Sequence, residues 1–297
     1  MKLICIYLRY FLIVLCIAIG VCGAKAQGGV EFPYPQIPVM MTEPQQRATY
    51  LLLHYWDNVD FNNPKLVAND DFMEQGFVNY LSVLPIVDAQ TAEQSVETMM
   101  KCAEVNVVAY KKFVGLAEKY LFEPNSPMVN DETYIMFLLQ ILNTNVLSKS
   151  EKSQFEHHYK VVMKNRVGSV ATDFRYIDSA GKSGSLHSLK AEKTLLLFYD
   201  PECDHCDEIV GKLQKDPLLN RRIAEGKMKV LAVYADGNID LWKKDLPSMP
   251  KNWTIVRDIS RIQPLGLYIL RAMPAIYLLD ANKKVIKKEL VPENLWE

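Results

Sequence analysis

Two cysteines separated by two residues, Cys203 and Cys206, lie in the segment FYDPECDHCDEIVGKL, residues 198–213. Such a pair can bind a metal ion, form a static disulfide, or alternate between reduced and oxidised states. A structural zinc ion takes four ligands, whereas this segment supplies two thiols with His205 between them. A static disulfide that closes so short a loop removes little chain entropy and stabilises a fold weakly. The pattern favours a redox-active pair.

Cys203 stands directly before a predicted helix at residues 204–215. The free N–H groups of a first helical turn and the helix dipole stabilise a negative sulfur, and the thiolate is the species that attacks a disulfide. We therefore expect Cys203 to be the exposed nucleophile and Cys206, one turn deeper, to be the resolving thiol. A protonated His205 would favour the thiolate further.

Acidic neighbours oppose this effect because negative charge disfavours a thiolate, although salt screens exposed charges over about 10 Å. We expect the helix terminus and His205 to prevail and to set a reduction potential between those of a strong reductant and a strong oxidant. The acids are Asp200, Glu202, Asp204, Asp207 and Glu208.

The segments around the cysteines predict a small mixed sheet. Residues 194–200 and 228–236 are apolar runs typical of strands covered on both faces. Residues 173–178 alternate between apolar and polar, and residues 275–290 predict a hairpin. Strands that alternate with helices and end in a hairpin predict an α/β domain over residues 168–297, with helices on both sides of the sheet.

Residues 44–167 predict an all-α domain of about six helices, because apolar residues recur at helical spacing throughout. The preceding residues 27–43, rich in glycine and proline, predict an extended leader. Predicted helix caps are Thr91 with Gln94, Asn130, and Ser148 with Glu151.

Several other reactive, charged or aromatic side chains are interpreted as structural. Cys102 is predicted to be a buried, inert thiol. His157 and His158 are predicted to lie on a solvated helix face, and Trp242 and Trp253 in the core. The final hairpin carries four lysines that are predicted to form its solvated face, namely Lys283, Lys284, Lys287 and Lys288.

Residues 1–26 have the features of a secretory signal peptide: basic residues, then an apolar run, then small residues at Ala24 and Ala26. We expect cleavage after Ala26 and no stable membrane insertion afterwards. Two alternatives are lipidation at Cys22 and an uncleaved membrane anchor, for which the apolar run is short. Export places the chain where disulfides persist.

The chain of 297 residues is long enough for two domains, and its 49% apolar content can supply their cores. Its formal net charge is −1. Without clustered lysine and arginine, a nucleic-acid partner is not expected.

Residues 168–290 resemble the exported thiol–disulfide oxidoreductases of thioredoxin fold that are described as TlpA- or ResA-like. The resemblance depends on the strand KTLLLFYDPEC, the Cys203–Cys206 motif, and Met273-Pro274 before the strand AIYLLD. It implies that Pro274 is cis and faces the cysteines, and that Pro274 and Met273 contact substrate. The helical part resembles a family of unknown function that precedes such modules.

The same resemblance implies an enzyme that exchanges its dithiol with protein or peptide thiols and disulfides, together with an unidentified redox partner. It implies no bound cofactor, because the cysteines are themselves the redox group. It also implies the periplasm of a Gram-negative bacterium, with membrane anchoring if the signal stays uncleaved.

The chain departs from the family pattern at four places. Glu202 replaces an aromatic residue, Leu197 and Ile209 stand where relatives carry a buried acid, and the closing helix is very short or missing. Two alternatives stay open, and the missing buried acid favours the first of them. One is a binding protein that uses its helical domain, with the thioredoxin fold as a scaffold. The other is a copper-handling protein that uses the two thiolates and a distant histidine such as His187.

Overall fold

The computed structural model describes residues 31–235, 238–288 and 290–296. The predicted signal peptide, residues 1–26, lies outside these residues, as does the start of the predicted leader. Within the described ranges, none of the helices combines the length and the apolar character that a membrane span requires.

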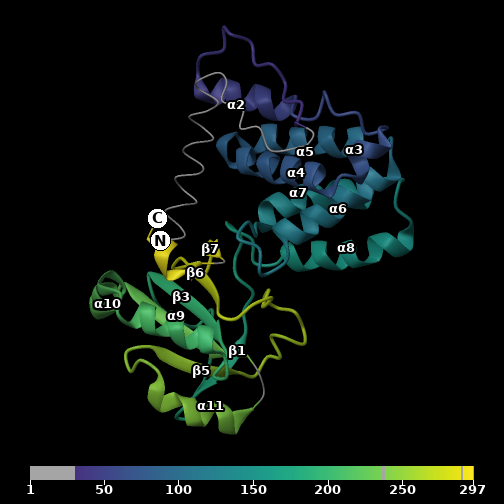
Figure 1. Ribbon diagram of the computed structural model, residues 1–297. Helices are drawn as coiled ribbons and strands as arrows, with labels where there is room; N and C mark the ends of the chain where they lie inside the picture. Colours follow the sequence, from purple (N-terminus) through teal and green to yellow (C-terminus); the bar gives the residue numbers. More distant parts are fainter. Residues whose placement is uncertain (1–30, 236–237, 289, 297) are drawn as a thin grey trace.

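The first half of the described chain is helical, and its helices lie together in the upper part of Figure 1. Asn130 caps its helix, and Ser148 with Glu151 forms a capping box, as predicted. The predicted cap at Thr91 is wrong. Asp88 is the N-cap residue instead, and its carboxylate accepts the N–H of Thr91. The helices are α2 (Pro44–Leu53), α3 (Pro64–Ala68), α4 (Asp70–Val83), α5 (Ala89–Ala103), α6 (Val107–Leu121), α7 (Asp131–Asn143) and α8 (Lys149–Val162), with the 3-10 turn η1 (Leu84–Ile86) after α4.

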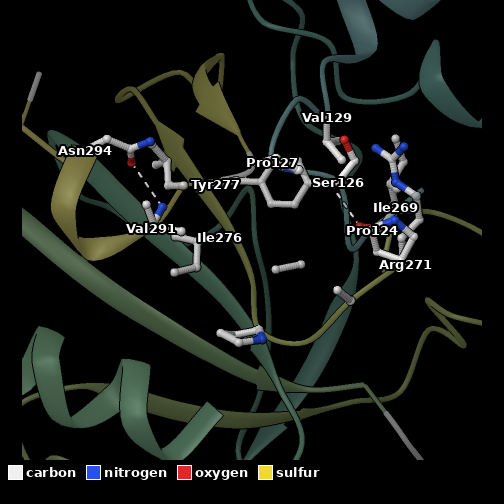
Figure 2. Close-up of a pocket in the computed structure, with 14 residues that line it drawn as sticks. Pro124, Ser126, Pro127, Val129, Ile269, Arg271, Ile276, Tyr277, Val291 and Asn294 are labelled. Carbon is white, nitrogen blue, oxygen red and sulfur yellow. Dashed lines mark hydrogen bonds between the residues drawn. The ribbon is translucent and has the colours of Figure 1, made fainter. Parts of the chain in front are cut away.

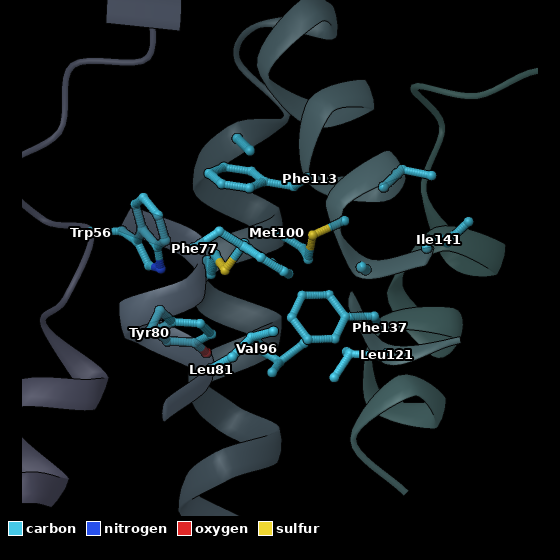
Figure 3. Packing of buried hydrophobic residues seen from close by; sticks show 14 of the residues in the cluster. Trp56, Phe77, Tyr80, Leu81, Val96, Met100, Phe113, Leu121, Phe137 and Ile141 are labelled. Atoms are coloured by element: carbon cyan, nitrogen blue, oxygen red, sulfur yellow. The ribbon is translucent and has the colours of Figure 1, made fainter. Parts of the chain in front are cut away.

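One aromatic-rich core holds these helices together (Figure 3). The ring of Phe113 on α6 lies 4.9 Å from that of Trp56 and 5.9 Å from that of Phe77 on α4, measured between centroids. Burial of each such side chain contributes about 1.5–3 kcal/mol, so the core is a large stabilising term.

The second half forms a seven-stranded mixed sheet of order β2-β1-β5-β4-β3-β6-β7, in the lower part of Figure 1. Its central pairs β3·β4 and β4·β5 are parallel, and the other pairs are antiparallel. The strands are β1 (Arg175–Asp178), β2 (Ser183–Ser185), β3 (Lys193–Tyr199), β4 (Met228–Tyr234), β5 (Thr254–Asp258), β6 (Ala275–Leu279) and β7 (Val285–Lys288). Helices α9 (Asp204–Gln214), α10 (Pro217–Ala224) and α11 (Ile239–Asp245) connect them, with the 3-10 turns η2 (Leu246–Ser248) and η3 (Pro292–Asn294).

The fold class is confirmed: an α/β sheet follows an all-α part. Strand β5 was missed in the sequence because it is short and only partly buried. The prediction of helices on both sides of the sheet is wrong for the described residues. Buried side chains of α9, α10 and α11 all belong to one core. The other face is covered by irregular segments, through side chains such as Phe174, Ile262 and Tyr268.

The two halves are joined by a buried ion cluster. The carboxylate of Asp131, at the start of α7, is fully buried and pairs with Arg271 at 2.6 Å and with Lys288 of β7. Asn165, after α8, adds a hydrogen bond from its amide to the carbonyl oxygen of Leu267 at 2.8 Å. These contacts link residues more than a hundred positions apart.

Three structural predictions need correction. Cys102 is exposed, because it lies on the outer face of α5. His158 is not solvated: its ring stacks on Phe122 at 4.1 Å. Two of the hairpin lysines are also buried rather than solvated. The Lys283 ammonium donates a hydrogen bond to the Thr194 hydroxyl, and the Lys288 ammonium pairs with the Asp131 carboxylate. Trp242 and Trp253 are in the core, as predicted.

Candidate active site

The cysteine pair lies where β3 passes into helix α9. Cys203 is the N-cap residue, with extended backbone angles (φ −105°, ψ 105°). Its Sγ accepts the backbone N–H of Cys206 at 3.3 Å. The sulfur therefore occupies the position at which a helix N-terminus offers free N–H groups, and the same groups would stabilise a thiolate.

The two thiols have different environments. Both are free cysteines; Cys203 is half-buried, whereas Cys206 is 1% exposed and lies in the core beneath α9. Burial, followed by its interaction with the Cys203 thiol, raises the pKa of Cys206 to about 12. Cys206 is therefore a protonated, buried thiol at neutral pH, and Cys203 is the more accessible of the two sulfurs.

A segment seventy residues further along the chain completes the site. The Met273–Pro274 peptide bond is cis. The Cys203 thiol donates to the carbonyl oxygen of Met273 at 3.7 Å. Pairing of Phe198 with Ala275 in adjacent strands β3 and β6 brings the segment to the cysteines. The structure thus places Cys203, Cys206, Met273 and Pro274 together.

His205 lies on the first turn of α9 with a side chain that is 60% exposed. Its Nδ1 is 3.6 Å from the carboxylate of Glu208, which also pairs with Lys212 at 2.8 Å. Lys212, and then His205, lower the pKa of Glu208. The imidazole therefore interacts with a neighbouring acid on the helix, and any influence on Cys203 acts through its charge.

Comparison with known proteins identifies both halves. Residues 18–165 match a family model described as a domain of unknown function, DUF5106. A thioredoxin-like protein from Bacteroides caccae is 35% identical; the match covers 89% of this chain and 96% of that one, with a TM-score of 0.86. The chain belongs to this thioredoxin-like family.

Two further solved structures match part of the thioredoxin-like protein. The C-terminal domain of an uncharacterised protein from Bacteroides fragilis is 38% identical, over 45% of this chain and 99% of that one, with a TM-score of 0.43. The thioredoxin domain of a thiol-disulfide oxidoreductase from Bacteroides vulgatus is 27% identical, over 44% and 93%, with a TM-score of 0.39. No curated protein matches the chain.

The positions of the missing buried acid are apolar and well packed. Leu197 on β3 is fully buried, and Ile209 on α9 is 4% exposed. Both belong to the same core as Cys206. Neither side chain can accept or deliver a proton, so no carboxylate at these two places assists the ionisation of Cys206.

The same core contains polar groups that the sequence analysis missed. The Tyr199 hydroxyl, the Trp242 indole N–H and one carboxylate oxygen of Asp245 are buried near one another, but none makes a hydrogen bond of ordinary geometry among the described residues. Burial, and then the charge of Asp245, raise the pKa of Tyr199. The residues come from separate elements, β3 and α11, so spacing in the sequence carries no signal of their proximity.

Groups of three or more His, Cys, Asp or Glu that could hold a metal ion do not occur within residues 31–235, 238–288 and 290–296. The ring Nε2 of His187, the distant histidine of the copper-handling alternative, hydrogen-bonds the carbonyl oxygen of Ala171 at 2.7 Å. That nitrogen is therefore engaged as a donor.

Proposed function

We propose that this thioredoxin-like protein is a thiol–disulfide oxidoreductase that exchanges a Cys203–Cys206 dithiol with disulfides of proteins or peptides. The observation that supports it best is the position of Cys203: its sulfur lies at the N-terminus of α9, 3.7 Å from the Met273 carbonyl oxygen. The buried Cys206 is one helical turn away.

The exchange has two steps. The Cys203 thiolate attacks a substrate disulfide, forms a mixed disulfide and releases the first substrate sulfur as a thiolate. Cys206 then loses its proton to water or to a leaving thiolate, attacks Cys203, and releases the second substrate sulfur. Two electrons pass to the substrate and the Cys203–Cys206 disulfide remains. A dithiol partner reverses the change, and the same steps in the opposite direction oxidise a substrate.

The other proposed site residues support these steps. The charge of His205 favours the thiolate of Cys203 when the ring is protonated. Met273 and Pro274 contact the substrate chain, because they border the reactive sulfur. The second step requires ionisation of Cys206, whose pKa is raised by burial, and the apolar Leu197 and Ile209 give that ionisation no help.

We also infer that the chain is organised as predicted: signal peptide 1–26, leader 27–43, helical domain 44–167 and thioredoxin-like domain 168–297. The last helix of the first half ends at Val162 and the first strand begins at Arg175, which is consistent with that boundary. Export to the periplasm is supported by the residue pattern of the signal peptide.

Reduction of insulin by dithiothreitol tests the proposal. The unmodified protein should accelerate the reduction, and Cys203→Ser should reduce the rate to that of dithiothreitol alone. Cys206→Ser should instead accumulate a mixed disulfide that mass spectrometry detects. Cys102→Ser is the matched control, because Cys102 is an exposed thiol outside the site, and it should retain full activity. Equal activity of Cys203→Ser and the unmodified protein would contradict the proposal.

A binding protein without enzymatic activity is the second candidate, favoured by the apolar residues at Leu197 and Ile209. It predicts that the unmodified protein does not accelerate insulin reduction at all.

A further inference from the structure

A cavity of about 440 Å³ lies between the two halves of the molecule, beside the cis proline. One wall is the α6–α7 segment, residues 122–130, which contributes Pro124, Pro127 and Val129. The opposite wall comes from the thioredoxin-like half and includes Ile276 and Val291. Figure 2 shows these two groups of side chains on opposite sides of the cavity. Its volume is within the range of about 300–1,000 Å³ that is typical of ligand sites.

The cavity adjoins the chain segment that contacts the Cys203 sulfur. Ala272 and Pro274 line it, and the residue between them, Met273, accepts the hydrogen bond from Cys203 at 3.7 Å. An extended peptide advances about 3.3 Å per residue. A polypeptide whose cysteine has reached Cys203 therefore passes the cavity with side chains only a few positions from that cysteine.

The chemistry of the walls favours an apolar side chain. Among the described lining residues Arg271 is the charged one, and it donates to the carboxylate of Asp131 at 2.6 Å and to the carbonyl oxygen of Phe122 at 3.0 Å. The amide oxygen of Asn294 accepts the N–H of Val291 at 3.0 Å. The charge of Arg271 and the amide oxygen of Asn294 are thus engaged within the protein, and the prolines, Val129 and Ile276 provide an apolar surface for a ligand.

The wall from the helical half is held in place before any ligand arrives. Ser126 donates to the carbonyl oxygen of Tyr120 at 2.6 Å and accepts the N–H of Met128 at 3.1 Å. The guanidinium of Arg271 packs over the ring of Phe122, 4.6 Å from its centre. A preformed wall needs little ordering on binding, so burial of a ligand side chain contributes directly to affinity.

We propose that the α6–α7 segment of the helical half forms one side of a substrate subsite, and that this subsite takes a bulky apolar side chain close to the reacting cysteine of a polypeptide. The inference rests on the proposed function and adds a substrate class: polypeptide disulfides with an apolar residue near the cysteine. It also assigns a role to the helical half, whose family model names none.

Pairs of short peptides test the proposal. Within each pair the peptides carry a glutathione-capped cysteine and differ only in one residue, Phe or Ser, placed two positions before or after that cysteine. We expect kcat/KM of the reduced protein to be about tenfold higher for the Phe peptide in at least one pair, as burial of one apolar side chain implies. Equal kcat/KM for both peptides in every pair would overturn the subsite.

Variants of the α6–α7 segment test whether the helical half causes the preference for the Phe peptide. Val129→Asp and Pro127→Asp should each reduce the Phe/Ser ratio to within about twofold, because a carboxylate at the wall opposes burial of an aromatic ring. Pro127 is exposed, so its variant tests the wall even if the half-buried Val129 does not tolerate the change. Asn125→Asp is the matched control; Asn125 is exposed in the same segment and does not line the cavity. A ratio that survives in both wall variants would overturn the role of this segment.

The proposed function has its own readout. Exchange of the unmodified protein with glutathione disulfide requires the cysteine pair and no apolar subsite. If that exchange is absent, the proposed function fails. If it is present and the peptides are not discriminated, the subsite fails alone.

Discussion

Replacement of Asp131 by asparagine is expected to destabilise the protein strongly. The Asp131 side chain is fully buried, and its two partners are nearly so: 13% of the Arg271 side chain and 6% of the Lys288 side chain are exposed. Asp131→Asn keeps the shape but removes the negative charge, so two buried cations lose the carboxylate that balances them. Loss of one partner from a buried ion pair costs about 3–5 kcal/mol.

Urea unfolding measures this loss. Because the asparagine side chain retains one hydrogen-bond acceptor, we expect the lower end of that range, about 3 kcal/mol. With a denaturant dependence of roughly 3 kcal/mol per M urea, appropriate to a chain of this size, the unfolding midpoint should fall by about 1 M.

Glu132→Gln is the matched control. Glu132 follows Asp131 in the first turn of α7 and is also ion-paired, to Arg166, but 41% of its side chain is exposed. Glu132→Gln removes a carboxylate from the same helix terminus, but from an exposed ion pair, and exposed ion pairs contribute little to stability. We expect a midpoint shift several times smaller. Equal shifts for the two variants would refute the argument from burial.

The double variant Asp131→Asn/Lys288→Met shows whether the stability lost in Asp131→Asn comes from an unpaired buried charge or from general disruption of the packing. Removing the buried cation as well should restore part of the stability, because the penalty comes chiefly from a charge without its counterpart. Since Lys288 belongs to the sheet and Asp131 to the helices, such recovery would also demonstrate energetic coupling between the halves. A double variant less stable than Asp131→Asn would contradict this reasoning.

Three further predictions concern the thiol site and the core beneath it. Burial raises the pKa of Cys206 above neutral pH. Its ionised fraction, and with it the release rate of glutathione from a mixed disulfide at Cys203, should therefore rise about tenfold per pH unit from about pH 7 to about pH 8; a flat profile would contradict this. The proposed stabilisation of the thiolate by the helix terminus and His205 predicts a reduction potential above that of thioredoxin, about −270 mV, on titration against glutathione buffers. A potential as low as that of thioredoxin would show that the acidic neighbours outweigh these two effects. Tyr199→Phe should leave the thermal midpoint unchanged or raise it, since the lost hydroxyl is buried and makes no hydrogen bond of ordinary geometry; a clear fall would show that the hydroxyl bonds its neighbours Trp242 or Asp245.

Local features of the chain could be predicted because they depend on neighbouring residues. The capping box of Ser148 with Glu151 requires only four consecutive residues. The strand at residues 193–199 contains an apolar run at residues 195–199, and the side chains of this run enter cores on both faces of the sheet, as such a run predicts. The place of Cys203 before a helix follows from the same local pattern.

Features that depend on distant partners could not be predicted. Lys288 looks like a surface lysine in the sequence, yet it is buried because Asp131, 157 positions away, supplies a buried carboxylate. Cys102 looks like a core residue within an apolar stretch, yet the rotation of α5 places it outside. The burial of Lys288 and the exposure of Cys102 are both set only when the helices and the sheet pack together.

The sequence by itself determined the candidate redox groups of the thioredoxin-like protein: two thiols in one helical turn, with a proline that the family resemblance places opposite them. Only the tertiary structure decided what surrounds that chemistry. Pro127 and Pro274 share one cavity because the chain folds back over some 150 residues, and contacts of that range are set by the packing of whole elements. Spacing along the chain encodes local geometry, whereas the walls of a site are assembled from segments that the sequence keeps apart.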